Sequence, residues 1–129
     1  MAELQRLSSF VHAVAIDPSI STLRPDYRAL IIAISGLTPT PSDASSEGML
    51  QAAEASARDL QASKPVTELP HIAAWRDAYK AFGAKPAKYR NSLEALTRRV
   101  TLDGKGGLPR INRLTDVYNA VSVSGIRWH

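Results

Sequence analysis

The sequence predicts an α+β fold in which two early β-strands precede three to four helices, all within a single domain over residues 1–129. Three observations predict this fold. Two short apolar runs, bounded by turn-forming residues, lie near the N-terminus. From Ser42 onward, apolar residues recur at the spacing of a helix face. The length of 129 residues and the hydrophobic share of 44% are ordinary for one globular domain.

The two predicted strands cover residues 9–16 (SFVHAVAI) and 27–35 (YRALIIAIS). An Asp-Pro pair ends the first run, and a Pro25-Asp26 turn precedes the second, because proline presets φ and aspartate bonds to nearby backbone. The second run is short enough to be a strand or a helix. Its three isoleucines favour a buried strand, since β-branched side chains fit a pleated surface.

Four later stretches show the spacing of helices. The first is rich in alanine, glutamate and glutamine, which are good helix formers. Pro70 suits the first turn of the second, and Gly83 suits its C-terminal end. Asn91 and Glu94 resemble a capping box at the start of the third. The four stretches are 47–62, 70–82, 91–100 and 111–121.

The last of these helices is predicted to carry two different faces. Its apolar face comprises Ile111, Leu114, Val117, Tyr118 and Val121. Three polar residues, Asn112, Asp116 and Asn119, fall on the opposite side at spacings of four and three. Asparagine and aspartate are poor helix formers because they compete for backbone bonds. The stripe is therefore either a solvated face or the lining of a site.

Charge is unevenly distributed along the chain, whose formal net charge is +4. Residues 1–63 hold four basic and seven acidic residues, whereas residues 64–129 hold twelve basic and five acidic ones. A basic half of this kind could bind a phosphate backbone. The alternative is a set of solvated helix faces.

Several classes of site are excluded or not indicated. The chain has no cysteine, so disulfides, thiolate zinc sites and cysteine nucleophiles are excluded. Its three histidines lie far apart, which gives no metal-binding pattern. No G-x-S-x-G elbow occurs, and no apolar run approaches the roughly 20 residues that span a bilayer. We therefore expect a cytoplasmic protein without a metal site.

The run 107–123 (GLPRINRLTDVYNAVSV) resembles a segment of the B3/4 domain, the editing module of the bacterial phenylalanyl-tRNA synthetase beta subunit. That segment reads approximately G-x-R-P-I-N-x-x-x-D-x-x-N-Y. Upstream motifs are similar to those of free-standing members of the family. These motifs are Pro25-Asp26-Tyr27-Arg28, Trp75-Arg76 with Tyr79 and Gly83, Lys85 with Lys88-Tyr89-Arg90 and Ser92, and Arg98-Arg99-Val100.

The resemblance implies an α+β, B3/4-like fold and hydrolysis, in trans, of the ester that joins a wrong amino acid to tRNA. It also implies that no metal and no organic cofactor takes part. It places Asn119 nearest the substrate, with Asp116 as the second catalytic candidate, and it assigns substrate binding to Asn112 and Arg110. A positioned water and hydrogen-bond donors would suffice for this chemistry. The tRNA backbone would be held by basic residues, namely Lys85, Lys88, Arg90, Arg98 and Arg99.

Family members continue past the last asparagine with a G-Q-P-x-H-A-F-D run, whereas this sequence reads SGIRWH at 124–129. The resemblance therefore implies an incomplete domain, and apolar surface around Val121 and Val123 would favour a homo-oligomer. Two alternatives stay open beside the hydrolase. One is a non-catalytic tRNA- or RNA-binding module that has lost the hydrolytic site. The other is a structural fragment with no nucleic-acid role.

Overall fold

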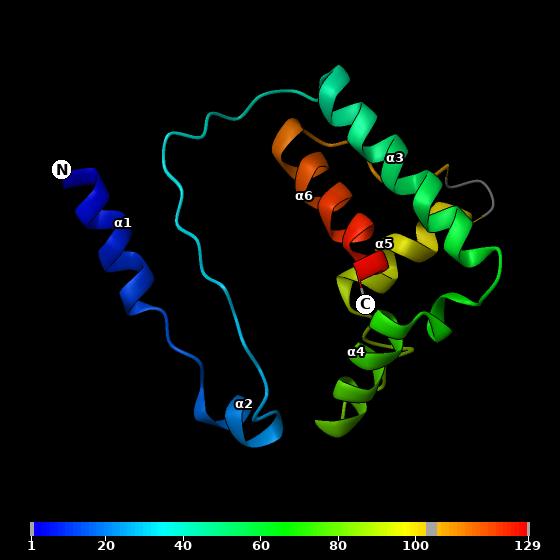
Figure 1. Cartoon of the computed structure of the whole chain (residues 1–129), viewed down its shortest axis with the longest axis horizontal. Helices are drawn as coiled ribbons and strands as arrows, with labels where there is room; N and C mark the ends of the chain where they lie inside the picture. The colour runs from blue at the N-terminus through cyan, green and yellow to red at the C-terminus, as the bar shows by residue number, and fades with distance from the viewer. Residues whose placement is uncertain (1, 103–105, 129) are drawn as a thin grey trace. The chain divides into compact units, whose positions relative to one another are not determined.

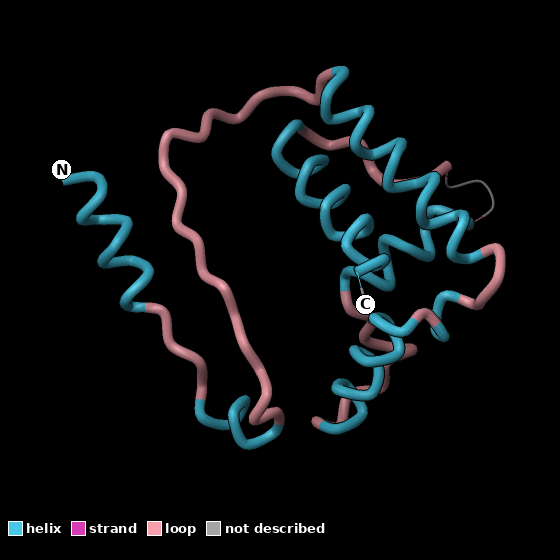
Figure 2. Tube along the Cα trace, in the orientation of Figure 1, coloured by secondary structure: helices cyan, strands magenta, loops and turns pink. Residues whose placement is uncertain are grey.

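The structure is a computed structural model that describes residues 2–102 and 106–128, and these residues form helices and loops only (Figure 2). In chain order the elements are α1 (Ala2–Ala13), α2 (Pro18–Leu23), α3 (Ala44–Gln61), the 3₁₀ turn η1 (Val66–Glu68), α4 (Pro70–Ala81), α5 (Ser92–Thr101), α6 (Arg113–Ser124) and the 3₁₀ turn η2 (Gly125–Trp128). The predicted α+β fold is therefore wrong, because the described part of the chain is all-helical and has no strand.

The chain divides into two compact units, Met1–Thr38 and Pro39–His129. Both predicted strands lie in the first unit. Residues 9–13 instead complete α1, which starts with helix-forming residues and an ion pair between Arg6 and Glu3 at 3.3 Å.

Residues 27–35 are neither helix nor strand, and their aliphatic side chains are exposed, as for Leu30 at 86% and Ile32 at 68%. A strand requires a hydrogen-bonded neighbour and a surface to cover. Neither is present for this run among the described residues.

In the second unit the four predicted helices are confirmed as α3 to α6, and their first turns explain where they begin. Asp43 caps α3 by accepting a hydrogen bond from the Ser46 N–H at 2.8 Å, and the Ser46 hydroxyl completes the capping box. Pro70 opens α4. Asn91 caps α5 through the Glu94 N–H at 3.0 Å, although the Glu94 carboxylate is used elsewhere. The same type of cap starts α6 at Asn112.

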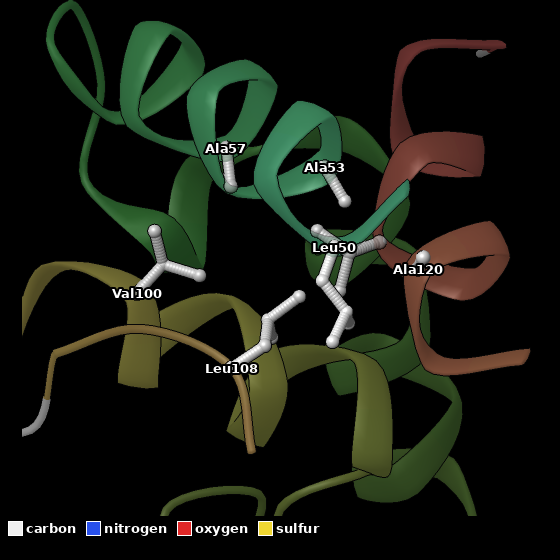
Figure 3. Close-up of a cluster of buried hydrophobic side chains, with 7 residues drawn as sticks. Leu50, Ala53, Ala57, Val100, Leu108 and Ala120 are labelled. Carbon is white, nitrogen blue, oxygen red and sulfur yellow. The ribbon is translucent and has the colours of Figure 1, made fainter. Parts of the chain in front are cut away.

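Two clusters of buried apolar side chains hold this unit together. In the larger one, small alanines let α3 and α6 lie side by side, as Figure 1 shows. Its members come from α3 (Leu50, Ala53, Ala57), α5 (Val100), the segment before α6 (Leu108) and α6 (Ala120, Val123), and they converge in Figure 3. The smaller cluster joins η1, α4, α5 and η2 through Val66, Leu69, Ile72, Leu93 and Ile126.

The two faces of α6 are reversed relative to a helix that buries its apolar side. Asp116 is fully buried and Asn119 is 9% exposed, whereas Leu114, Tyr118 and Val121 are 54%, 56% and 58% exposed. The polar stripe is therefore neither a solvated face nor the lining of an open site. It packs inward because its small neighbours permit close approach to α3 and because Asp116 finds hydrogen-bond partners there.

Candidate functional site

Two of the three polar residues on α6 fix the backbone at the start of that helix. The Asn112 side chain accepts a hydrogen bond from the Thr115 N–H at 2.8 Å and so acts as the N-cap. The Asp116 carboxylate accepts from the Ile111 N–H at 2.8 Å and from the Ser42 hydroxyl at 2.5 Å. Asp116 thus joins the loop before α3 to the start of α6, and Asn112 caps the helix itself. The geometry of both side chains explains folding rather than substrate contact.

Asn119 differs from its two neighbours on the stripe. Its side chain is more than nine-tenths buried on the side of α6 that carries Ala120 and Val123. Within residues 2–102 and 106–128 its amide forms no hydrogen bond. Its side-chain oxygen and nitrogen are not among the fully buried polar atoms that lack a partner, so they keep some contact with solvent.

Arg110 is fully engaged with two carboxylates of α3. Its Nε and Nη2 donate to Glu47 at 3.0 and 2.7 Å, and its Nη1 and Nη2 donate to Glu54 at 2.5 and 3.0 Å. Nη1 also donates to the Leu108 carbonyl at 2.8 Å. A guanidinium has five N–H donors, and five contacts are made here. Arg110 therefore has no donor left for the substrate-binding role that the resemblance assigns to it.

These bonds also set the ionisation of the cluster. Hydrogen bonding to Arg110 holds the pKa of the Glu54 carboxyl below its usual range, aided by the Leu108 N–H and opposed by burial. The pKa of Glu47 is lowered in the same way, and the pKa of Arg110 is raised. Gly107 completes the arrangement: at a φ of +112°, a Cβ there would lie 2.0 Å from Glu54 Oε2. Only glycine leaves room for the carboxylate at this turn.

An open groove of about 630 Å³ lies elsewhere, where α4, the first turn of α5 and the C-terminal end of α6 meet. Trp75 supplies an aromatic surface that is 42% exposed, and Tyr79 also belongs to the lining. The lining residues are His71, Trp75, Tyr79, Asn91, Ser92, Leu93, Val121, Ser122 and Gly125. The lining thus has aromatic and small polar groups, and the three polar residues of the α6 stripe are not among them.

Three arginines converge on one buried carboxylate, that of Glu94, which directly follows the groove-lining Leu93 in the sequence. Glu94 is 0% exposed and accepts from Arg76 Nε at 2.7 Å and Nη2 at 3.1 Å, and from Arg98 Nε at 3.0 Å. Arg90 Nε lies 3.4 Å from the same carboxylate. Hydrogen bonding to Arg76 lowers the pKa of Glu94, with Arg98 contributing and burial opposing. The carboxylate is therefore ionised and holds the arginines in place.

The other predicted tRNA-binding residues are not part of this cluster. Arg99 Nε donates to the Gly107 carbonyl at 2.9 Å and so supports the glycine turn. Lys88 lies over the Tyr89 ring, with Nζ 5.2 Å from the ring centroid. Lys85 is exposed in the connector between α4 and α5. The structure thus brings together two of the five basic residues, Arg90 and Arg98.

Sequence reasoning missed two members of the cluster, Arg76 and Glu94, and the groove beside it. Arg76 looks like a residue of an exposed helix face, and Glu94 looks like half of a capping box. One signal was available: Glu94 stands four residues after Arg90 and four before Arg98, a spacing at which side chains can meet near a helix start. The contact with Arg76, 18 residues away, depends on tertiary packing.

Comparisons with family models, curated proteins and solved structures give no match to this chain. Among the described residues, no group of three or more histidine, aspartate or glutamate side chains could hold a metal ion. None of the described helices has the length and apolar character needed to cross a bilayer.

Proposed function

We propose that the chain is a tRNA-binding module related to the B3/4 family, and that its groove receives the unpaired 3′ end of the tRNA. One observation carries the proposal. Motif residues on which the family resemblance rests, far apart in the sequence, meet in one place. Trp75, Tyr79 and Ser92 line the groove, and Arg90 and Arg98 lie at the cluster beside it.

The chemistry of the groove suits an unpaired nucleotide. Unstacked bases bind to aromatic faces, at about 1–3 kcal/mol per base. Trp75 offers such a face, since it is 42% exposed within the groove. Asn91 and Ser92 supply polar groups at the same wall. An aromatic face with a few polar groups favours an unpaired nucleotide over a double helix, whose bases are already stacked.

The charge around the groove suits the backbone of the same strand. Arg90 and Arg98 side chains are 45% and 31% exposed, so their guanidinium groups remain accessible to solvent while they contact Glu94. Arginine donors bind phosphate without reading sequence. Binding would then depend on the unpaired end and on salt, and little on base identity.

Hydrolysis of mischarged tRNA is the second candidate function, and it would require Asn119 to reach the substrate, although this side chain is buried and lies outside the groove lining. Asn112, Asp116 and Arg110 are committed to structural bonds, whereas the Asn119 amide has no hydrogen bond among the described residues. A deacylation assay with mischarged tRNA tests this candidate. The hydrolase requires Asn119→Ala to lower the rate while the melting temperature stays near that of the wild type.

The binding proposal is tested by measuring the affinity for deacylated tRNA with and without its unpaired 3′ nucleotides. We expect the trimmed tRNA to bind at least tenfold more weakly, because the groove is then empty. Trp75→Ala should cause a similar loss for intact tRNA, through lost stacking of about 1–3 kcal/mol. It should have little effect on the trimmed one.

Leu114→Ala is the matched control, because Leu114 is 54% exposed in the first turn of α6 and lies outside the groove lining. It should bind both tRNAs like the wild type. Equal affinity of the wild type for intact and trimmed tRNA would contradict the proposal, as would equal losses in the two variants.

A further inference from the structure

The arginine cluster around Glu94 has more positive charge than its buried carboxylate requires. Arg76 alone makes a two-bond contact with Glu94, at 2.7 and 3.1 Å, which is enough to neutralise that charge. Arg90 and Arg98 are added to the same carboxylate, at 3.4 and 3.0 Å. Three guanidinium groups against one carboxylate leave an excess of two positive charges in a small volume.

Most of the hydrogen-bond donors in this cluster are still unused. Each guanidinium has five N–H donors. Arg98 uses one of its donors on Glu94, and Arg76 uses two. The side chains of Arg76, Arg98 and Arg90 are 19%, 31% and 45% exposed, so each reaches solvent. The cluster therefore presents fixed, partly desolvated donors of the kind that bind phosphate oxygens in pairs.

Glu94 keeps these donors in place before any ligand arrives. It is completely buried in the first turn of α5, and its backbone N–H is fixed by the Asn91 cap at 3.0 Å. Guanidinium groups held in position lose little side-chain entropy on binding. A carboxylate in contact with solvent would compete with phosphate for these arginines. A buried carboxylate instead fixes the position of the guanidinium groups and leaves their solvent-facing donors available.

From this geometry we infer that Arg76, Arg90 and Arg98 form a phosphate site for an anionic group, or pair of groups, of total charge close to −2. Glu94 is its positioning residue. This inference rests on the proposed function and identifies the part of the RNA that binds next to the groove. Arg76 directly follows Trp75, and Arg90 directly precedes Asn91, so both flank residues of the groove lining. A strand with one base on Trp75 passes its phosphates over the cluster.

Two forms of RNA carry this charge: two neighbouring phosphodiesters of the strand, or one terminal phosphomonoester. The experiment compares two unpaired oligoribonucleotides of the same sequence, one with a 5′-hydroxyl and one with a 5′-monophosphate. Affinity is measured across a salt series for the wild type, Arg90→Gln and Arg98→Gln. The control is Lys80→Gln, which removes one positive charge from an exposed position of α4 outside the cluster.

We expect Arg90→Gln and Arg98→Gln each to lower affinity about tenfold, as loss of a charge-assisted hydrogen bond does. Each should also reduce the slope of log affinity against log salt by about 0.7, the value for one phosphate of a single strand. Lys80→Gln should leave both quantities near the wild type. Equal effects on both RNAs identify phosphodiesters as the ligand. An effect confined to the 5′-monophosphate RNA identifies the phosphomonoester.

Two outcomes overturn the inference, and they are distinguishable. If the wild type binds but Arg90→Gln and Arg98→Gln behave like Lys80→Gln, the cluster is not a phosphate site, while RNA binding in the groove stands. If the wild type binds neither RNA, the proposed function itself fails. Loss of folding is not expected, because both variants retain the Arg76–Glu94 pair, and thermal melting by circular dichroism checks this.

Discussion

Replacing Gly107 with alanine should destabilise the second unit far more than the same change at Gly106. Both glycines have a positive φ, +112° and +74°, so alanine at either position is strained. That strain costs about 1–3 kcal/mol. The two positions differ in the room available for a side chain. A Cβ at Gly107 would lie 2.0 Å from Glu54 Oε2, whereas a Cβ at Gly106 would meet nothing within 4 Å.

The additional cost at Gly107 comes from displacing a buried carboxylate. Glu54 is 5% exposed and accepts hydrogen bonds from the Leu108 N–H at 2.7 Å and from Arg110 at 2.5 and 3.0 Å. Disrupting a buried ion pair so that one charged partner is left without the other costs about 3–5 kcal/mol. With a urea m-value of about 1.5 kcal/mol/M, this difference moves the unfolding midpoint by about 2–3 M relative to Gly106→Ala.

Urea unfolding followed by tryptophan fluorescence measures this difference, since both tryptophans lie in the second unit. A double-mutant cycle isolates the cause. In a Glu54→Ala background the clash is gone, and Gly107→Ala should cost only its backbone strain. The reasoning is refuted if Gly107→Ala and Gly106→Ala shift the midpoint equally, or if the cost of Gly107→Ala is unchanged without Glu54.

Three further predictions concern stability and use the same urea assay. Asn112→Ala should cost about 1 kcal/mol through loss of the α6 cap, and Asn112→Ser should restore most of it; equal midpoints for the alanine variant and the wild type would contradict the capping role. Asp116→Ala should cost about 1–3 kcal/mol, because it leaves a part-buried backbone N–H and a hydroxyl without an acceptor, and an unchanged midpoint would count against this. Because the folded pKa values of Glu54 and Glu94 are lowered, their contribution is present above the unfolded value of about 4.3 and is lost as pH falls through the folded values. The wild type should therefore lose stability below about pH 4. Glu94→Gln should be less stable than the wild type at pH 7 and should lose less stability on acidification. Identical stability profiles against pH for the two proteins would contradict this.

The helices of the second unit could be predicted because their signals are local. Pro70, the Asn91 cap and the regular spacing of apolar residues all act within a few residues of each helix start. The strands could not be predicted in this way. Isoleucine-rich runs such as 27–35 have high β propensity, but that propensity describes fit to a partner surface. Without such a partner among the described residues, the run stays irregular and exposed.

The candidate site was predicted in part, and the errors have a common physical source. Periodicity separates the two faces of α6 but does not show which face packs against the rest of the unit. The polar face packs inward because the Asp116 carboxylate accepts hydrogen bonds from Ser42 and from the Ile111 N–H. Arg110 appeared available for a substrate because its partners on α3 lie 63 and 56 residues away. Arg90 and Arg98 lie close together because each stands four residues from Glu94, Arg90 just before α5 and Arg98 within it. The spacing of residues along the sequence does not show which distant segments come into contact.

The affinity of the wild-type chain for intact tRNA, measured between about 50 and 200 mM salt, tests the central claim most directly. Contacts with two to three phosphates predict a log–log slope of about −1.4 to −2.1. They also predict weaker binding once the unpaired 3′ nucleotides are removed. Absence of binding at the lowest salt, or binding that neither salt nor removal of the 3′ end weakens, would contradict an RNA site built from the groove and the arginine cluster.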